Sequence, residues 1–370
     1  MKLLLPLLFL LILFVFPSCK KKKQEETRSF YMGVTPWPAD FTTVELNTSY
    51  SFVNNECDLV SHHFDEGIPY EEAYNNNGWP QELINELDTR VSKTGKSKTI
   101  FLSSSAVDLS RKQKAVYSRF STNVSTAIKN QWEALAANDD KVVTAYSNYV
   151  LFLANRLNAT FINYGVESNG DWTNAEFLLY KDFISKVYIK LKAALPQKPV
   201  FLSVMTSEVP LNLSYASQLM PYSDYLALSS YPYTHVSSTA NGNTNPNLFP
   251  SSYFDNYLNL APSKPFGFAE TGYIAEDLQV PSFNLNKQGK AESQRDYLKL
   301  IITKTQQRKG KFIIWFCSKD YDAGNNTLRS LGIYQDIFAL WEDTGLIDEN
   351  NVQRPSYSTW KEWMSKRRTD

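Results

Sequence analysis

The feature that most constrains the fold is a succession of eight short apolar runs along the chain. Each run is rich in β-branched or aromatic residues and ends in small or polar residues, which is typical of buried strands. The runs cover residues 31–35, 57–63, 98–103, 160–167, 199–205, 225–230, 265–270 and 311–316. Segments of helical character lie between them, as expected of strands that pair in parallel through crossover helices.

The intervening helices are predicted at residues 81–89, 140–156, 180–195, 215–220, 293–308 and 331–343. In the second of these, Val143, Tyr146, Val150 and Leu153 recur at spacings of three and four, which gives one apolar helix face. Eight strand-and-helix units over roughly 330 residues fit a single α/β domain, a (β/α)₈ TIM barrel with long loops on its C-terminal face. The polar segment 234–262, after the sixth strand, is the longest candidate for such a loop.

The N-terminal residues predict export. Lys2 precedes the apolar run 3–16, which is too short for a permanent membrane span. The run leads into Phe-Pro-Ser-Cys at Cys19, which resembles the lipobox of bacterial lipoproteins, where the cysteine is lipidated. We therefore expect a lipoprotein signal peptide over 1–18, a polar tether over 19–29 and the barrel over 30–370. The protein would then be lipid-anchored in the bacterial cell envelope, at the outer membrane or cell surface. Secretion without an anchor is the alternative.

Two glutamates close predicted strands. Glu167 ends the fourth run and Glu270 ends the seventh. An ionised carboxylate at the end of an apolar strand is costly to bury unless it is paired or used in chemistry. Because the C-terminal ends of barrel strands meet at one mouth, the two side chains can face each other across it. Such a pair can cleave a glycosidic bond, one protonating the leaving oxygen while the other attacks the sugar or activates water.

With these residues the chain resembles the clan A glycoside hydrolases, in particular arabinogalactan endo-β-1,4-galactanases and their relatives. The resemblance implies a retaining hydrolase of β-linked polysaccharides or oligosaccharides, with Glu167 as general acid/base and Glu270 as nucleophile. The chain departs from the clan at Val166, where the clan has an asparagine that binds the sugar 2-hydroxyl. Asn169 or Asn163 is the candidate replacement. A catalytically inactive carbohydrate-binding lipoprotein on the same barrel is the alternative function.

Further substrate-binding residues are expected beside the strand ends. Trp37 follows the first strand and can stack on a sugar ring. His62 and His63 end the second strand, and one imidazole should face the site. For each of these residues, ordinary packing or hydrogen bonding in the core is the alternative.

The resemblance also implies roles for three aromatic residues. Trp315, on the eighth strand, is similar to the tryptophan that floors the sugar subsite in the clan. Tyr231 and Tyr233 lie in a segment similar to the one that contacts the nucleophile. Tyr231 is the better candidate for a hydrogen bond to Glu270.

Charge and composition exclude other classes of function. The 38 Lys and Arg residues balance 38 Asp and Glu residues, which argues against a nucleic-acid partner. Three cysteines and three histidines provide neither a disulfide framework nor a metal motif, and adjacent His62 and His63 on a strand point to opposite faces. Asp320, Asp322 and Asn325 lack EF-hand spacing and fit a solvated turn. We expect no metal or cofactor, and a monomer.

Overall fold

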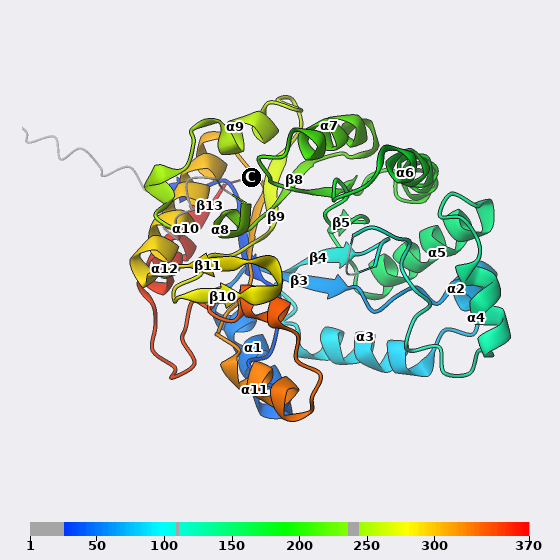
Figure 1. Ribbon diagram of the computed structural model, residues 1–370, viewed down its shortest axis with the longest axis horizontal. Coiled ribbons are helices and arrows are strands. Elements are labelled where there is room, and N and C mark those ends of the chain that lie inside the picture. Colours follow the sequence, from blue (N-terminus) through cyan, green and yellow to red (C-terminus); the bar gives the residue numbers. More distant parts are fainter. Residues whose placement is uncertain (1–25, 109–110, 236–243, 370) are drawn as a thin grey trace, which may run out of the picture.

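The eight predicted strands form the central sheet of the protein, which the computed structural model describes at residues 26–108, 111–235 and 244–369. They are β2 (Tyr31–Val34), β3 (Leu59–Phe64), β4 (Thr99–Ser104), β5 (Phe161–Asn163), β6 with β7 (Val200–Phe201 and Ser203–Met205), β8 (Leu226–Ser230), β9 (Phe266–Thr271) and β12 (Phe312–Trp315). All pairs are parallel, in the order β6-β5-β4-β3-β2-β12-β9-β8-β7. Only Leu202 separates β6 from β7, so the two ends of this order belong to one strand. The sheet therefore closes into the predicted (β/α)₈ barrel (Figure 1).

Helices surround the barrel. The α-helices are α1 (Thr43–Glu56), α2 (Tyr70–Asn75), α3 (Gln81–Lys93), α4 (Thr126–Glu133), α5 (Asp140–Arg156), α6 (Asn174–Ala194), α7 (Pro210–Leu219), α8 (Pro232–His235), α9 (Ser252–Leu258), α10 (Ala291–Gln307), α11 (Asp322–Ser330) and α12 (Pro355–Met364). The 3₁₀ turns are η1 (Met220–Tyr222), η3 (Pro246–Leu248), η4 (Pro281–Phe283) and η5 (Asp336–Trp341), and a hairpin of β10 (Leu278–Val280) and β11 (Leu285–Lys287) precedes α10. Helix α5 has the predicted bounds.

Several helix predictions need correction. Helix α3 continues to Lys93 and α7 begins at Pro210, beyond the predicted bounds. Helix α6 begins six residues earlier than predicted, because the Thr173 side chain caps it in a capping box with Glu176. The segment predicted as a helix at 331–343 is instead a turn after α11 followed by η5, since Gly332 adopts a left-handed conformation with φ of 70° just after α11. Helix α1 was not predicted, because its sequence is mostly polar and only a short stretch that includes Phe52 and Val53 is buried.

The interior of the barrel holds a layer of aromatic side chains. It contains Leu59, Phe101, Phe161, Phe201, Ala227, Ala269, Phe312 and Ile314, all buried. Phe101 and Phe312 pack edge to face with ring centroids 5.1 Å apart. At Gly267 a Cβ atom would lie 2.5 Å from the Phe312 ring, so the layer requires glycine at this strand position. Four phenylalanines of this layer therefore close the barrel below its mouth.

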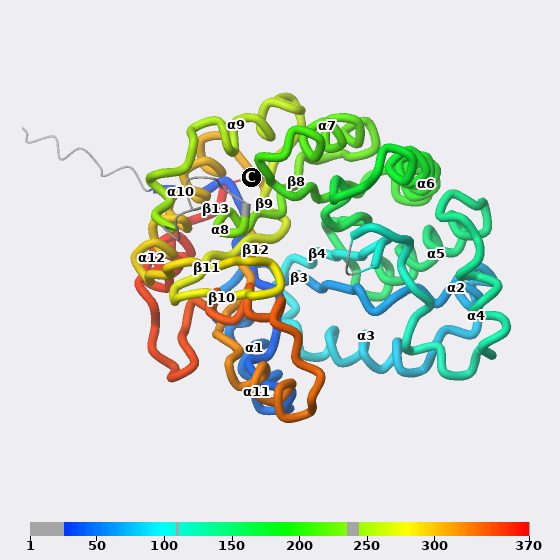
Figure 2. Tube along the Cα trace, in the orientation of Figure 1, coloured from blue at the N-terminus to red at the C-terminus, as the bar shows by residue number. Residues whose placement is uncertain are grey.

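The two ends of the described chain are held together. Strand β1 (Thr27–Arg28) pairs in parallel with β13 (Arg367–Arg368), so the blue start and the red end lie side by side (Figure 2). Arg28 is buried and forms a 2.8 Å ion pair with Asp58. Strand β1 thus lies inside the expected tether at 19–29. Cys19 and the expected signal peptide lie outside the described residues. Within the described part of the chain, no helix combines the length and the apolar character needed to cross a bilayer.

Candidate active site

A bulge at the end of β9 aims Glu270 into the barrel mouth. The pairing of β9 with β8 shifts register between Leu228 and Ser229, and its pairing with β12 shifts at the same level. As a result Ala269 packs in the interior layer, while Thr271 points outward and its hydroxyl bonds to Tyr297 of α10. The extra residue lets Ala269 and Glu270 both face inward, as bulges beside active sites often do. Strict alternation along the strand would have turned Glu270 away from the mouth.

Glu270 is held by two neighbouring side chains. The Tyr231 hydroxyl donates to Oε1 at 2.7 Å, which confirms the predicted hydrogen bond. His63 Nδ1 lies 3.8 Å from Oε2, and His63 Nε2 lies 3.5 Å from Asp65 Oδ2. Burial raises the pKa of Glu270, the His63 charge opposes this rise, and the Glu167 charge adds to it. The two carboxylates therefore act on each other across one mouth.

The electrostatic partners of His63 favour its charged form. Burial alone would lower the pKa of His63, but the hydrogen bond to Asp65 and the charges of Asp65 and Glu270 raise it above its ordinary value. Asp65 shows the converse, since burial would raise its pKa and the His63 contact brings it down to about 2. A cationic imidazole beside Glu270 stabilises the carboxylate form, which is the form that can attack a sugar.

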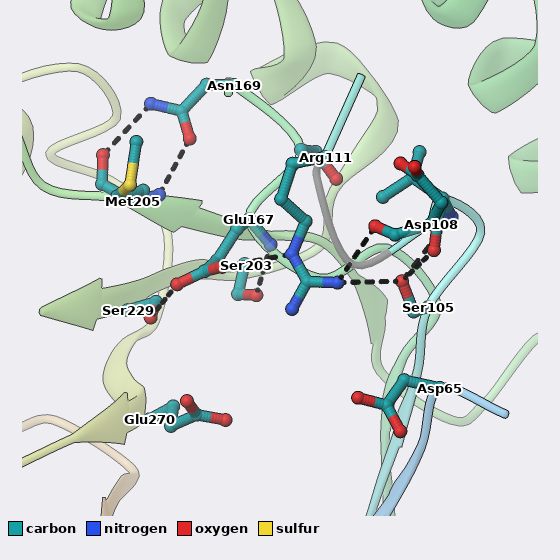
Figure 3. Close-up of polar contacts among 12 residues, drawn as sticks. Asp65, Ser105, Asp108, Arg111, Glu167, Asn169, Ser203, Met205, Ser229 and Glu270 are labelled. Carbon is teal, nitrogen blue, oxygen red and sulfur yellow. Dashed lines mark hydrogen bonds and ion pairs between the residues drawn. The ribbon is translucent and has the colours of Figure 1, made fainter. Parts of the chain in front are cut away.

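Glu167 reaches the same mouth from a turn and not from a strand end. Strand β5 ends at Asn163, four residues earlier than predicted, and Glu167 has a left-handed backbone with φ of 49°. Its backbone N–H donates to Ser203 Oγ at 3.1 Å. Its Oε1 accepts from Ser229 Oγ at 2.8 Å. Figure 3 shows its side chain above Glu270, on the same side of the barrel.

Asn163 ties the inner ends of the neighbouring strands together. Its amide nitrogen donates to Ser103 Oγ and Ser203 Oγ, both at 3.2 Å, and its oxygen accepts from the backbone N–H of Ser203 at 3.0 Å. Ser203 Oγ also accepts a hydrogen bond from the backbone N–H of Glu167. This buried network therefore fixes the turn that carries Glu167.

A cation that the sequence analysis missed covers Glu167. Arg111, in the loop after β4, places Nε 3.0 Å from Glu167 Oε2 (Figure 3). The Arg111 side chain keeps only 19% of its surface exposed, and that of Glu167 18%. No spacing rule could have found this pair, because Arg111 lies 56 positions before its partner in a loop of irregular structure. The one available signal was the cluster of basic residues in that loop.

Four predicted substrate-binding residues have other roles in the structure. Asn169 uses its amide to hold β7, accepting from Met205 N–H and donating to the Met205 and Asn212 carbonyls. His62 faces the outer helices, where Nε2 lies 3.3 Å from Thr94 Oγ1, and burial lowers its pKa well below the ordinary value. These two residues are buried and do not line the mouth, which corrects the expectation that they contact substrate.

The other two are aromatic. Trp315 is fully buried on the outside of the barrel, where its indole N–H donates to the Thr344 carbonyl at 2.8 Å. Tyr233 is also fully buried, and its hydroxyl donates to the Leu340 carbonyl at 2.6 Å. Tyr233 packs edge to face on Tyr231 and so supports the ring that contacts Glu270. Neither side chain offers a surface to a sugar.

An aromatic pair nevertheless stands at the mouth. Trp37, just after β2, is 43% exposed, and its ring centroid lies 6.0 Å from that of Phe316. Phe316 follows Trp315 directly and is only partly buried. The resemblance implied Trp315, whereas the neighbouring residue Phe316 carries the ring that lies beside Trp37. Val166, the point of departure from the clan, is buried and offers no polar group.

Two groups of carboxylates could offer oxygen ligands to a cation. They are Glu276 with Asp320 and Glu349, and Asp320 with Asp322 and Asp343, with ligand atoms within 4.8 Å of one another in each group. Arg354 contacts both Asp320 and Glu276 and already compensates part of this charge. Burial raises the pKa of Asp320 to about 7 and that of Asp343 to about 8. Asp320 and Asn325 are almost fully buried, so this segment is not the solvated turn that the sequence suggested.

Comparison with known proteins places the fold. No family model matches the sequence, and no curated protein matches it. Among solved structures, the chain is similar to GH5_18 from Streptomyces cattleya in complex with Manb1-4GlcNAc, at 14% identity and a TM-score of 0.62, covering 90% of this chain and 80% of that one. It is similar to fungal beta-1,4-galactanases at 12% identity and 0.55, covering 90% and 99%.

A third structure is an exo-beta-1,4-mannosidase from Opitutaceae bacterium strain TAV5, with 13% identity, a TM-score of 0.59 and 91% of this chain covered. The present chain spans only 59% of that mannosidase. At this level of identity the similarity shows the fold alone, a (β/α)₈ barrel of the kind found in these mannosidase and galactanase structures, which confirms the predicted fold.

The hydroxyl of Tyr231 provides a first prediction. Replacing Tyr231 by Phe removes the only donor that reaches Glu270 Oε1 among the described contacts, so a reaction that uses Glu270 should slow about 10- to 100-fold. The measurement is kcat on the best substrate of the protein. Tyr233→Phe is the matched control, since it removes a hydroxyl that bonds to a carbonyl away from Glu270. Equal rates in the two variants would contradict a role for Tyr231 in holding Glu270.

Proposed function

We propose that the protein is a retaining glycoside hydrolase that acts on β-linked polysaccharides or oligosaccharides. The observation that carries the proposal is the convergence of two carboxylates, Glu167 and Glu270, on one barrel mouth, each with its own polar partners. Glycosidic bond cleavage needs such a pair, with one group to move a proton and the other to stabilise or attack the anomeric carbon.

In the first step Glu270 attacks the anomeric carbon while the bond to the leaving oxygen breaks and Glu167 gives its proton to that oxygen. The product is a glycosyl ester on Glu270. In the second step Glu167 takes a proton from water, the hydroxide attacks the anomeric carbon, and the ester bond breaks. The sugar leaves with its original configuration, and both carboxyl groups return to their starting states.

The surroundings of Glu270 support its role as nucleophile. Tyr231 fixes one carboxylate oxygen by a hydrogen bond, and the His63 imidazole, itself held by Asp65, lies beside the other. A carboxylate oriented in this way pays less for alignment when it attacks. Trp37 and Phe316 together offer an aromatic surface at the same mouth, where a sugar ring can stack.

A substrate panel tests the proposal. The solved structures with a similar fold include a mannosidase and galactanases, so the panel should hold β-1,4-linked mannan, galactan and glucan oligosaccharides. We expect release of a reducing sugar from at least one of them, and proton NMR of the first product should show the β anomer before it equilibrates. Release of the α anomer would contradict double displacement.

A second candidate is a non-catalytic carbohydrate-binding protein on the same barrel. The ion pair between Arg111 and Glu167 favours it, because a carboxylate paired with a guanidinium is a poor proton donor. Calorimetry together with product analysis separates the two functions. A non-catalytic binding protein would bind an oligosaccharide of the panel without cleaving it. Cleavage that depends on Glu270 would exclude the second candidate.

The cellular location is a further part of the proposal. The apolar run 3–16 followed by Cys19 supports a lipid anchor on the bacterial cell envelope. We expect the full-length protein to sediment with membranes and to take up a radioactive fatty acid, and Cys19→Ser to lose both properties. A Cys57→Ser variant, which changes a buried cysteine of the barrel, is the control. Fatty-acid labelling that persists in Cys19→Ser would contradict the anchor.

A further inference from the structure

The contact between Arg111 and Glu167 conflicts with the proposed role of Glu167 as the proton donor. Arg111 Nε donates to Glu167 Oε2, and a guanidinium nitrogen cannot accept a hydrogen bond. This contact stabilises the ionised form of Glu167, although a general acid must carry a proton. Ser229 occupies the other oxygen of Glu167. In the free protein both oxygens of the candidate acid therefore accept hydrogen bonds, an arrangement that favours the carboxylate form.

The guanidinium is only partly bound to its own loop. Its Nη1 donates to Ser105 Oγ at 3.3 Å and to the Asp108 carbonyl at 3.4 Å, both near the upper limit for a hydrogen bond. Its Nη2 makes no hydrogen bond with the residues that the structure describes. In Figure 3 this nitrogen points away from Ser105, toward the space above Glu270. A donor is thus available where a substrate would lie.

The backbone on both sides of the ion pair is in an uncommon conformation. Arg111 has φ of 59° and Glu167 has φ of 49°, a left-handed region that side chains with a Cβ rarely occupy. Gly170 packs directly against the Arg111 backbone, and a Cβ there would lie 3.1 Å from Arg111 Cβ. Such conformations cluster at sites that switch or bind ligands, because the surrounding structure must hold them in place.

We propose that Arg111 is a displaceable clamp on Glu167. In the free protein it keeps Glu167 as a carboxylate, and a bound glycan draws the guanidinium to its own hydroxyl groups. Glu167 then takes one proton from solvent and can donate it to the glycosidic oxygen. This inference rests on the proposed function. Arg111 is in these terms a positioning residue, because it acts on the reaction through Glu167.

The charged and titratable groups around Glu167 set the background for a test by titration. Arg111 approaches from the β4 loop, Glu270 from β9, Tyr231 from the end of β8, and His63 from β3. Of these groups, Arg111 alone makes a direct ion pair with Glu167. Removing the guanidinium should therefore raise the pKa of Glu167, whereas removing a nearby charge that makes no contact should not.

The titration is carried out by carbon NMR on protein labelled at its glutamate carboxyl carbons. The Glu167 signal is assigned by its loss in Glu167→Gln. We expect Arg111→Met to raise the pKa of Glu167 by about 1–3 units relative to the wild type, and Arg111→Lys to restore most of the difference. Lys112→Met is the matched control, since Lys112 is the exposed neighbour on the same loop. A Glu167 pKa equal in wild type and Arg111→Met would overturn the proposal.

Kinetics test the transfer of the guanidinium to the substrate. Arg111→Met should raise KM about 10-fold, because a donor to the glycan is lost, and should move the basic limb of the kcat/KM profile, which reports the free protein, to higher pH. A change in kcat alone, at unchanged KM, would contradict the transfer. Thermal unfolding of each variant shows whether it is folded, and Arg111→Gln replaces the methionine variant if that one is not.

The hydrolase function and the role of Arg111 as a clamp on Glu167 can be disproved separately. If the wild type cleaves no member of the panel but Arg111→Met still raises the Glu167 pKa, the hydrolase function is wrong and the clamp on Glu167 remains. If the protein cleaves a glycan and the Glu167 pKa is the same in wild type and Arg111→Met, the proposed role of Arg111 is wrong and the hydrolase function remains.

Discussion

Replacing Glu270 by Gln should reduce kcat at least about 10,000-fold while the protein stays folded. The amide has nearly the same shape and can still contact Tyr231, but it cannot form the glycosyl ester that the proposed mechanism requires. The measurement is turnover of the best glycan substrate, with thermal unfolding as the check on folding. Glu82→Gln, at an exposed position on α3, is the matched control and should keep full activity.

Azide distinguishes loss of a nucleophile from general damage. In Glu270→Ala the shortened side chain leaves room for a small anion, which can attack the anomeric carbon of an activated aryl β-glycoside directly. The product should be an α-glycosyl azide, since a single displacement inverts the configuration. A β-glycosyl azide from this variant would assign the nucleophile to another residue.

Replacing Glu167 by Ala should give a loss that depends on the leaving group. With a sugar as leaving group, kcat/KM should fall about 1,000-fold or more, because proton donation to the departing oxygen is lost. With a dinitrophenolate leaving group, which departs without a proton, the first step should be nearly unaffected. The measurement compares the two substrates at one pH in wild type and variant.

The second step gives an independent check on Glu167. A dinitrophenyl glycoside should accumulate the glycosyl ester on Glu270, because no base remains to activate water. Azide should then release a β-glycosyl azide, the opposite anomer from that expected for Glu270→Ala. An equal loss on both substrates would show that Glu167 does not act as the proton donor.

The barrel itself could be predicted because its signal is local. Eight apolar runs with polar ends appear directly in the sequence, and each became a strand of the sheet. The position of Glu270 was also predictable, since it ends one of these runs. The inward direction of the Glu270 side chain was not predictable, because the bulge at Ala269 depends on register shifts against both neighbouring strands.

The parts of the site that come from loops could not be predicted. Glu167 was placed on a strand, whereas it lies in a turn held by Ser203 and Asn163. Arg111 reaches it through an irregular loop whose path no periodicity encodes. Trp315 and Phe316 are neighbours on opposite faces of one strand end, and composition alone cannot choose between them.

The pairing of β1 with β13 determines how the barrel would be oriented if the protein were attached to a surface through its N-terminus. Strand β1 comes directly before β2, so it lies at the end of the barrel where the strands begin. Glu167 and Glu270 meet at the other end, where the strands finish. A protein attached through its N-terminus would therefore present the open end of the barrel outward. A bulky, even insoluble, polymer could approach the catalytic opening without being obstructed by the supporting surface.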